Sequence, residues 1–207
     1  MAENSLTEAE VFFYSRVQEI LKLSCRKRFK IRKICCVDSS YSDGMVKTVA
    51  VLSDSENINE VSSYTDRCRF PYHPGLFFLR EGPPSVEAVR RLKSKPDVVC
   101  FDAHGRIHPR GAGMAIICGA VLSMPSVGIA KSPFVGTEIP FRQGISKIVY
   151  NGETVGFATS FYKKKRYWSP GFCFSINSLL KFIEDYWQIS MKAMTVAHRL
   201  ASSRKSA

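Results

Sequence analysis

Three acidic residues follow hydrophobic segments, so each could be delivered to a shared site by a buried element. Asp38 ends the apolar run ICCVD, Glu81 ends GLFFLRE, and Asp102 ends DVVCFD, just before a loop of His, Gly, Arg and Pro. Carboxylate oxygens are preferred ligands of Mg²⁺, which stabilises charge on phosphoryl oxygens and activates water without a covalent intermediate. The three acids are therefore candidate metal ligands. The alternative is that each acid is a helix cap or a surface partner.

Lys131 follows SVGIA, residues 126–130, which reads as a short buried strand. An ammonium at the end of that strand is placed to hold a phosphate oxygen or to orient water near a metal, because lysine binds phosphate as a point charge. The alternative is an exposed lysine with no role beyond ending the strand.

The segment PYHP, residues 71–74, is stiff because its two prolines fix φ. It presents Tyr72 and His73 on a rigid tip. A base must leave the stack before a pocket can inspect it, and an inserted ring can fill the gap that it leaves. Tyr72 is therefore a candidate wedge, against the alternative of a proline-braced loop with a surface tyrosine.

The charge balance favours a polyanionic partner. The formal net charge is +12 over 207 residues, and residues 22–33 hold seven basic residues and no acid. A field of that sign raises the local concentration of nucleic acid, although a basic face kept for solubility is the alternative. The run Lys163–Arg166 has Phe161, Tyr162, Tyr167 and Trp168 around it, which combines phosphate-binding charge with stacking rings. We expect Lys163 and Lys164 to bind the strand that flanks the site.

Length and composition indicate one domain over residues 1–207, with a basic tail from about residue 200. No run of eighteen apolar residues occurs, and the first ten residues, MAENSLTEAE, are polar where a signal peptide needs a basic start. We expect a soluble monomer without a membrane partner, located in the cytoplasm, or in the nucleus if the host is eukaryotic. The seven cysteines are an odd set without a CxxC pair, and we expect reduced, mostly buried thiols.

The first half of the chain reads as a helix followed by a strand meander. A capping box of Ser5 and Glu8 predicts an amphipathic helix to about residue 24, which should pack on a sheet. Strands predicted at 34–37, 45–52 and about 57–63 form an antiparallel meander around the Asp43-Gly44 turn.

The second half reads as alternating helices and strands. Pro83 and Pro84 can open a helix to about Lys93, and a strand at 98–102 then favours parallel pairing. We expect a helix at about 111–123, a strand at 126–130, a hairpin of strands 148–150 and 155–160, a helix from the Ser175 cap to about Trp187, and a last basic helix to about Arg199. The sum is a mixed α/β sheet with helices on both faces.

The segments FPYHPGLFFLRE, DVVCFDAHGRIHPRGAG and SVGIAK, in this order and spacing, resemble endonuclease V. The motifs VDSSYSDG and SPGFCFS extend the resemblance over roughly residues 10–190. It implies an RNase H-like fold, with the three-strand meander continued by parallel strands and flanked by helices. It also implies a divalent-cation-dependent nuclease that cuts on the 3′ side of hypoxanthine, in DNA repair or in processing of inosine-containing RNA.

The resemblance assigns roles to individual residues. It makes Asp38 and Asp102 metal ligands with Glu81 beside them, Lys131 a catalytic lysine and Tyr72 a wedge, with Mg²⁺ as the cofactor and Mn²⁺ as a substitute. Glycines suit a pocket that reads a flat ring with backbone groups, because side chains would collide there. The expected base-binding residues beside Tyr72 are Pro71, His73, Pro74, Gly75, Phe77, Gly105, His108 and Gly113. DNA and RNA substrates both stay open, because no motif fixes a 2′-OH contact.

Three positions depart from the family pattern. Phe172 follows Gly171 where the family has a histidine, Asn177 stands where an acid is usual, and Ala103 replaces a glycine. A phenyl ring cannot hydrogen-bond a metal-bound water or a phosphate. We predict retained cleavage with altered metal preference, because the carboxylates and the pocket residues are present. The alternatives are a protein that binds inosine-containing nucleic acid without cutting, and a related hydrolase acting on another base or a branched structure.

Overall fold

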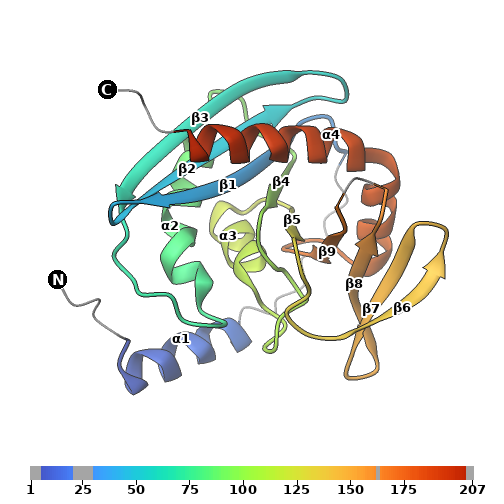
Figure 1. Ribbon diagram of the computed structural model, residues 1–207, viewed down its shortest axis with the longest axis horizontal. Helices are drawn as coiled ribbons and strands as arrows, with labels where there is room; N and C mark the ends of the chain where they lie inside the picture. The colour runs from blue at the N-terminus through green and yellow to red at the C-terminus, as the bar shows by residue number, and fades with distance from the viewer. Residues whose placement is uncertain (1–5, 21–29, 162–163, 204–207) are drawn as a thin grey trace.

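The computed structural model describes residues 6–20, 30–161 and 164–203 (Figure 1). The predicted Ser5 cap and the position of Lys163 lie outside these ranges. The elements within them are α1 (Glu8–Ile20), β1 (Ile34–Ser42), β2 (Met45–Ser53), β3 (Ile58–Arg67), α2 (Phe77–Arg90), β4 (Val98–Phe101), α3 (Met114–Leu122), β5 (Ser126–Ala130), β6 (Thr137–Arg142), β7 (Ile145–Tyr150), β8 (Glu153–Thr159), β9 (Arg166–Pro170) and α4 (Ile176–Ser202).

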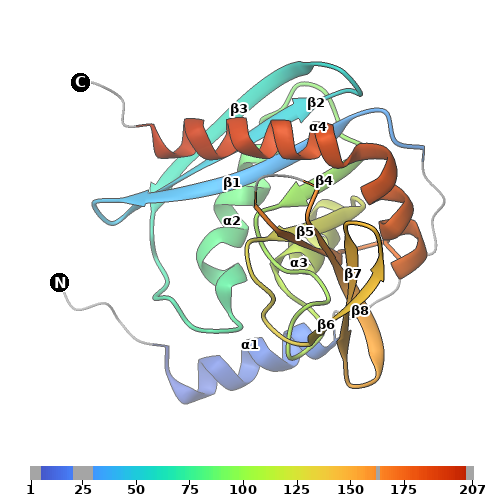
Figure 2. The same ribbon diagram turned by 45° about the vertical axis from the view of Figure 1, so that its right-hand side comes forward.

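All nine strands join one sheet in the order β3-β2-β1-β4-β5-β9-β8-β7-β6. The pairs β1–β4 and β4–β5 are parallel and the other pairs are antiparallel. Helix α4 covers one face, and α2 and α3 cover the other (Figures 1 and 2). The expected mixed sheet with a meander, parallel strands and helices on both faces is confirmed.

The central strands are apolar on both sides because helices cover both faces of the sheet there. Residues 34–38 of β1, 98–101 of β4 and 126–130 of β5 are all buried. Strand β3 lies at one edge and alternates half-buried with exposed residues, as a strand with one covered face does. The hairpin turn between β1 and β2 uses Asp43 and Gly44 at φ 52° and 72°, as the sequence predicted.

Helix α2 begins six residues earlier than predicted. It starts at Phe77, so Pro83 and Pro84 lie inside it, and Glu81 is on a helix instead of at a strand end. A short apolar run such as GLFFL does not distinguish a strand from a buried helix, and the prolines were wrongly assigned to the first helical turn.

Helix α1 does not pack on the sheet as expected. It lies beside the start of α2 and the loop before α3 (Figures 1 and 2), with the Tyr14 ring edge-on to Phe78 at 6.4 Å. Its N-terminus is a reciprocal capping pair, because the Glu10 carboxylate accepts from the Thr7 N–H and the Thr7 hydroxyl accepts from the Glu10 N–H. The capping motif was therefore read two residues too early.

The C-terminal region contains a single helix where two were predicted. Ser175 caps α4 as expected, but the helix continues without a break to Ser202. Strands β6 and β9 were not predicted, although the hairpin around Asn151-Gly152 was. Among the described residues no helix has the length and apolarity that a membrane crossing needs. Cys35, Cys36, Cys68, Cys100 and Cys118 are free thiols as expected, whereas Cys173 is disulfide-bonded.

Candidate active site

Parallel pairing brings Asp38 and Asp102 to the same edge of the sheet. Val37 of β1 is in register with Phe101 of β4, and the Asp102 N–H donates to the Val37 carbonyl at 3.0 Å. The sequence predicted Asp38 at the end of a strand. Instead, β1 continues to Ser42 because it pairs with β2 in the hairpin. Asp38 stands where the parallel pairing with β4 stops, so the two carboxylates still lie beside each other.

Asp38 is a buried carboxylate, 7% exposed, with two hydrogen-bond partners. Its Oδ2 lies 2.6 Å from His198 Nδ1, and its Oδ1 accepts from the Ser39 N–H at 2.9 Å. Burial and the neighbouring Asp102 charge raise the pKa of Asp38, and the His198 contact opposes that rise. The carboxylate therefore gains from any positive charge brought beside it.

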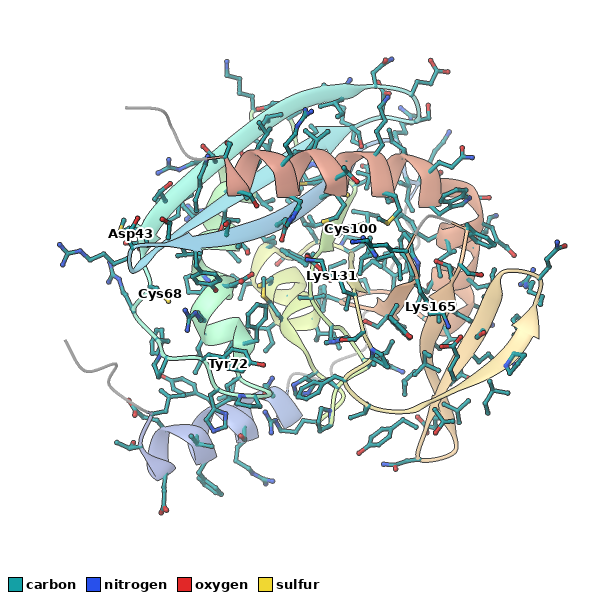
Figure 3. All side chains as sticks on the ribbon, viewed as in Figure 1. Asp43, Cys68, Tyr72, Cys100, Lys131 and Lys165 are labelled. Atoms are coloured by element: carbon teal, nitrogen blue, oxygen red, sulfur yellow. The ribbon has the colours of Figure 1, made fainter. Side chains whose placement is uncertain are left out.

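Lys131 follows β5 as predicted and reaches Asp102 directly. Its ammonium donates to Asp102 Oδ2 at 2.7 Å. Burial lowers the pKa of Lys131, but the hydrogen bond and charge of Asp102 outweigh burial and raise it, so the lysine is cationic at neutral pH. In Figure 3 Lys131 lies near the middle of the molecule, in front of the central strands.

Glu81 lies behind the other two acids. Its carboxylate is 7% exposed and accepts from the Tyr41 hydroxyl at 2.8 Å. Burial raises the pKa of Glu81 to about 7, and the Asp38 and Asp102 charges act in the same direction. A pKa raised into this range is suited to proton transfer near neutral pH.

A cleft of about 680 Å³ opens beside this group of residues. Asp38, Asp102, Lys131 and His198 line it. The last turns of α4 supply Met191, Met194 and Thr195 to the same wall, and the basic run supplies Lys164, Lys165 and Arg166. Cations from two segments and carboxylates from two strands therefore meet in one cleft.

A second cavity of about 300 Å³ shares a wall with the cleft. Asp102 and Lys131 line both cavities. The predicted base-binding residues Tyr72, Gly75, Phe77, His108 and Gly113 line this second cavity, which we call the base pocket. Its size and largely apolar walls fit a small flat heterocycle.

Tyr72 lines the base pocket and is also exposed to solvent, as expected for an aromatic side chain on a stiff loop. It is 63% exposed, and its ring meets Phe77 edge-on with 6.3 Å between centroids. It lies on the side of the molecule nearest α1, away from Lys165 (Figure 3). Pro71, His73 and Pro74 flank it on the same loop but are not among the residues that line the cavity.

Gly105 lies outside the pocket, against β9. Its N–H donates to Ser169 Oγ at 2.7 Å, and an added Cβ would stand 2.1 Å from the Pro170 carbonyl oxygen. Glycine is needed there for close packing of two backbones. Gly113 is in the pocket wall, but its Cβ would likewise meet the His104 carbonyl oxygen at 2.3 Å.

The basic run contributes charge to the cleft but not every ring that was expected. Lys164 lines the cleft, and its contact with the nucleic-acid strand stays a prediction. Trp168 is fully buried, and its indole N–H donates to Thr159 Oγ1 at 2.9 Å, so it cannot stack on a base. Phe161 is 37% exposed and packs on Trp187 of α4 instead.

Phe172 lies at the opposite end of β5 from Lys131. Its N–H donates to Ser126 Oγ at 2.8 Å, and its carbonyl accepts from the Ser126 N–H at 2.9 Å, so it bonds to the first residue of the strand. Asn177 is exposed at the start of α4, more than five turns from His198. Neither departure borders the cleft, whereas Ala103 lines the base pocket.

Two adjacent carboxylates on one cleft suit a hard divalent cation, which often takes one or two protein carboxylates plus phosphate oxygens. Within residues 6–20, 30–161 and 164–203, no three His, Cys, Asp or Glu side chains form a group that could hold a metal ion. Asp102 is paired with Lys131, and Glu81 is bonded to Tyr41. Asp38 and Asp102 fit the role of ligands, and the three-acid metal site stays a prediction.

Sequence reasoning did not identify several residues of these two cavities, among them His198 in the cleft and Gln18 and Phe134 in the base pocket. A usable signal existed for His198. Met191, Met194 and His198 recur at helical spacing, so a histidine falls on the apolar face of the last helix. The pocket residues come from loops and from α1, where no periodicity points to them.

Known proteins are similar to this chain in sequence and in fold. The family model of endonuclease V matches residues 15–199. Endonuclease V of Thermofilum pendens is 31% identical over 180 residues, covering 84% of this chain and 78% of that protein. The crystal structure of endonuclease V from Bacillus subtilis has a TM-score of 0.80 at 21% identity, covering 97% of this chain and 94% of that one.

A second crystal structure holds Ciona intestinalis endonuclease V in complex with a 24mer DNA containing an inosine followed by a ribo-adenosine. Its TM-score is 0.79 at 18% identity, over 94% of this chain and 97% of that one. The RNase H-like fold implied by the motifs is thereby confirmed. With a family model covering nearly all of the described sheet and a relative above 30% identity, the chain belongs to the endonuclease V family of endonucleases.

Proposed function

We propose that this protein is a divalent-cation-dependent endonuclease that recognises hypoxanthine in a nucleic-acid strand and hydrolyses a phosphodiester bond on its 3′ side. It acts as a monomer on inosine-containing DNA or RNA. The observation that carries the proposal is that the base pocket and the cationic cleft share Asp102 and Lys131. A nucleotide whose base entered the pocket would have its backbone beside both carboxylates.

Each residue has a task in this proposal. Tyr72 enters the stack where the base has left, and Phe77 supports its ring. Lys131 exchanges Asp102 for a phosphate oxygen, and His198 holds the Asp38 carboxylate in one orientation. Glu81, with its pKa raised to about 7, is proposed to exchange a proton near the site.

Mg²⁺ is the proposed cofactor, with Mn²⁺ able to replace it and with Asp38 and Asp102 as the protein ligands. Bound there, the cation would stabilise charge on the phosphate and lower the pKa of a water. The raised pKa of Asp38 supports the proposal, because a carboxylate that is costly to ionise beside Asp102 favours a cation between them.

Cleavage of end-labelled oligonucleotides tests the function. Matched DNA and RNA strands with one inosine or one adenosine are incubated with excess protein and Mg²⁺ or Mn²⁺. We expect one product, cut 3′ of inosine, and none from adenosine. Asp38→Asn should cut at least about 100-fold more slowly while binding the strand equally well, because it loses one cation ligand.

Asp43→Asn is the matched control. Asp43 lies in the exposed turn of the same hairpin, where its carboxylate accepts from the Ser42 hydroxyl, and it does not line the cleft, so its loss should leave cleavage unchanged. Equal binding of inosine strands with no product at enzyme excess would replace this proposal with a binding protein that does not cut. Equal cutting of inosine and adenosine strands would refute recognition of the base.

A further inference from the structure

Gln18 of α1 is fully buried although it belongs to a helix that lies away from the sheet. It also lines the base pocket. Among the α1 residues whose side chains the structure describes, Gln18 alone is buried. A buried amide must be hydrogen-bonded on both its oxygen and its nitrogen to avoid a large desolvation cost.

Both ends of the Gln18 amide are bonded to the loop before α3. Its Nε2 donates to the Ala112 carbonyl at 2.8 Å, and its Oε1 accepts from Arg110 Nε at 2.7 Å. The partners fix which end is which, because a carbonyl can only accept and a guanidinium can only donate. A residue 92 positions earlier in the chain therefore sets the orientation of Arg110.

Arg110 is also hydrogen-bonded to the loop of residues 71–76, which contains Tyr72 and which we call the wedge loop. Its terminal nitrogen donates to the Gly75 carbonyl at 2.6 Å, and His108 Nε2 lies 3.1 Å from the same oxygen. Gly75 adopts φ 80°, and the Leu76 N–H donates to the His73 carbonyl, so residues 73–76 form a tight turn with glycine at its third position. That turn directly follows Tyr72.

We propose that Gln18 and Arg110 form a clasp that fixes the wedge loop, residues 71–76, against the pocket loop, residues 108–113. These two residues then set how tightly the target nucleotide is held. They are positioning residues, because they act through the Gly75 carbonyl and the 108–113 backbone. The inference rests on the proposed function for its substrate. It goes beyond that function by giving α1 a part in selecting the base.

The geometry separates this role from the chemical step. None of the clasp residues lines the cleft that holds Asp38 and His198. Loosening the clasp should therefore weaken binding of the flipped base and leave the cut of a bound strand nearly unchanged. Loss of one buried hydrogen bond corresponds to about a tenfold change in affinity.

Gln18→Met keeps the side-chain length and removes both hydrogen bonds. We expect KM for an inosine strand to rise about tenfold while kcat stays within about twofold. Arg110→Met should do the same, and the double variant should be no worse than the poorer single variant, because both break one clasp. Phe12→Ala is the control, since Phe12 is on the same helix and 70% exposed.

Three results would overturn the clasp. The first is a fall in kcat at unchanged KM, and the second is a rise in KM of the double variant equal to the product of the two single rises. The third is an equal effect of Phe12→Ala. Hydrogen exchange of the intact, substrate-free protein tests it without any activity. Gln18→Met should speed exchange at the Leu76 and Gly111 amides, which are bonded within the two loops, and Phe12→Ala should not.

The two measurements separate the failures. If exchange responds as expected but the wild type cuts no inosine strand, the clasp stands and the proposed function fails. If the wild type cuts and neither exchange nor KM responds to Gln18→Met, the clasp fails and the proposed function stands.

Discussion

At the scale of single residues, the hydrogen bonds of His108 define its protonation state. Its Nδ1 accepts from the Arg110 N–H at 3.2 Å, so its proton must be on Nε2, facing the Gly75 carbonyl. Burial, helped by the Arg110 charge, lowers the pKa of His108 to about 4. A proton added at Nδ1 would face another donor, which makes the neutral ring part of the pocket structure.

His108 should make the protein acid-labile. Its pKa is about 4 when folded and near 6.5 when unfolded, so the unfolded chain binds more protons between these values. The free energy of unfolding should be fully present above pH 6.5 and fall as the pH drops toward 4, by up to about 3 kcal/mol. His108→Gln should flatten this slope in urea unfolding measured across that range. Burial also lowers the pKa of His104 to about 4, so both proteins keep part of the pH dependence. Parallel plots of the free energy of unfolding against pH for the wild type and His108→Gln would contradict the role of His108.

His198 should matter for rate more than for binding. It is the partner of Asp38 Oδ2, and if Asp38 binds the cation as we propose, loss of such a partner costs about 10- to 100-fold. We expect His198→Ala to lower single-turnover cleavage by about that factor while the strand still binds. A rate within twofold of the wild type would show that Asp38 needs no such support.

At the scale of elements, Lys47 of β2 ties down the last turn of α4. Its ammonium donates to the Leu200 carbonyl at 2.7 Å and to the Ser203 carbonyl at 3.1 Å, two acceptors that the end of the helix leaves open. His198 is in the same turn. The position of His198 beside Asp38 therefore depends on a residue of another strand.

Lys47→Met should release that turn. We expect the free energy of unfolding to fall by about 1–2 kcal/mol, and cleavage to slow because His198 is less well held. Thermal unfolding and single-turnover assays measure the two effects. Lys192→Met is the comparison, because Lys192 is on the same helix and bonds an exposed carbonyl of Glu56. Equal losses in both variants would argue for a general effect on α4.

The elements also show how far the sequence reaches. The positions of Asp102 and Lys131 after strands were predicted correctly, because each follows a short apolar run with β-branched residues, which favour a strand. Glu81 was assigned to the wrong kind of element because aromatic residues suit both helix and strand. The helical spacing places His198 on the apolar face of α4, but its partner Asp38 lies 160 residues away, and the Gln18 partner Ala112 lies 94 residues away, so no local pattern encodes either contact.

At the scale of the whole molecule, the net charge of +12 predicts binding that weakens with salt. Each phosphate contact contributes about 0.9 to the slope of log K against log salt for a duplex, or about 0.7 for a single strand. Lys164→Glu should reduce the slope by about one such contact or more, because Lys164 lines the cleft. Lys95 is exposed and precedes the start of β4, at the end of the strand opposite Asp102. Lys95→Glu should therefore leave the slope unchanged. Equal slopes for all three proteins would remove Lys164 from the interface.

The bond between His198 and Asp38 joins residues 160 positions apart. Contacts of such high sequence separation form late in folding, because the entropy of closing a long loop must be overcome first. A chain with its central strands paired but α4 undocked would hold both carboxylates without the histidine. If His198 supports the reaction as we propose, we expect cleavage to require complete folding, so that a partly folded copy would be a poor nuclease toward any strand that it meets.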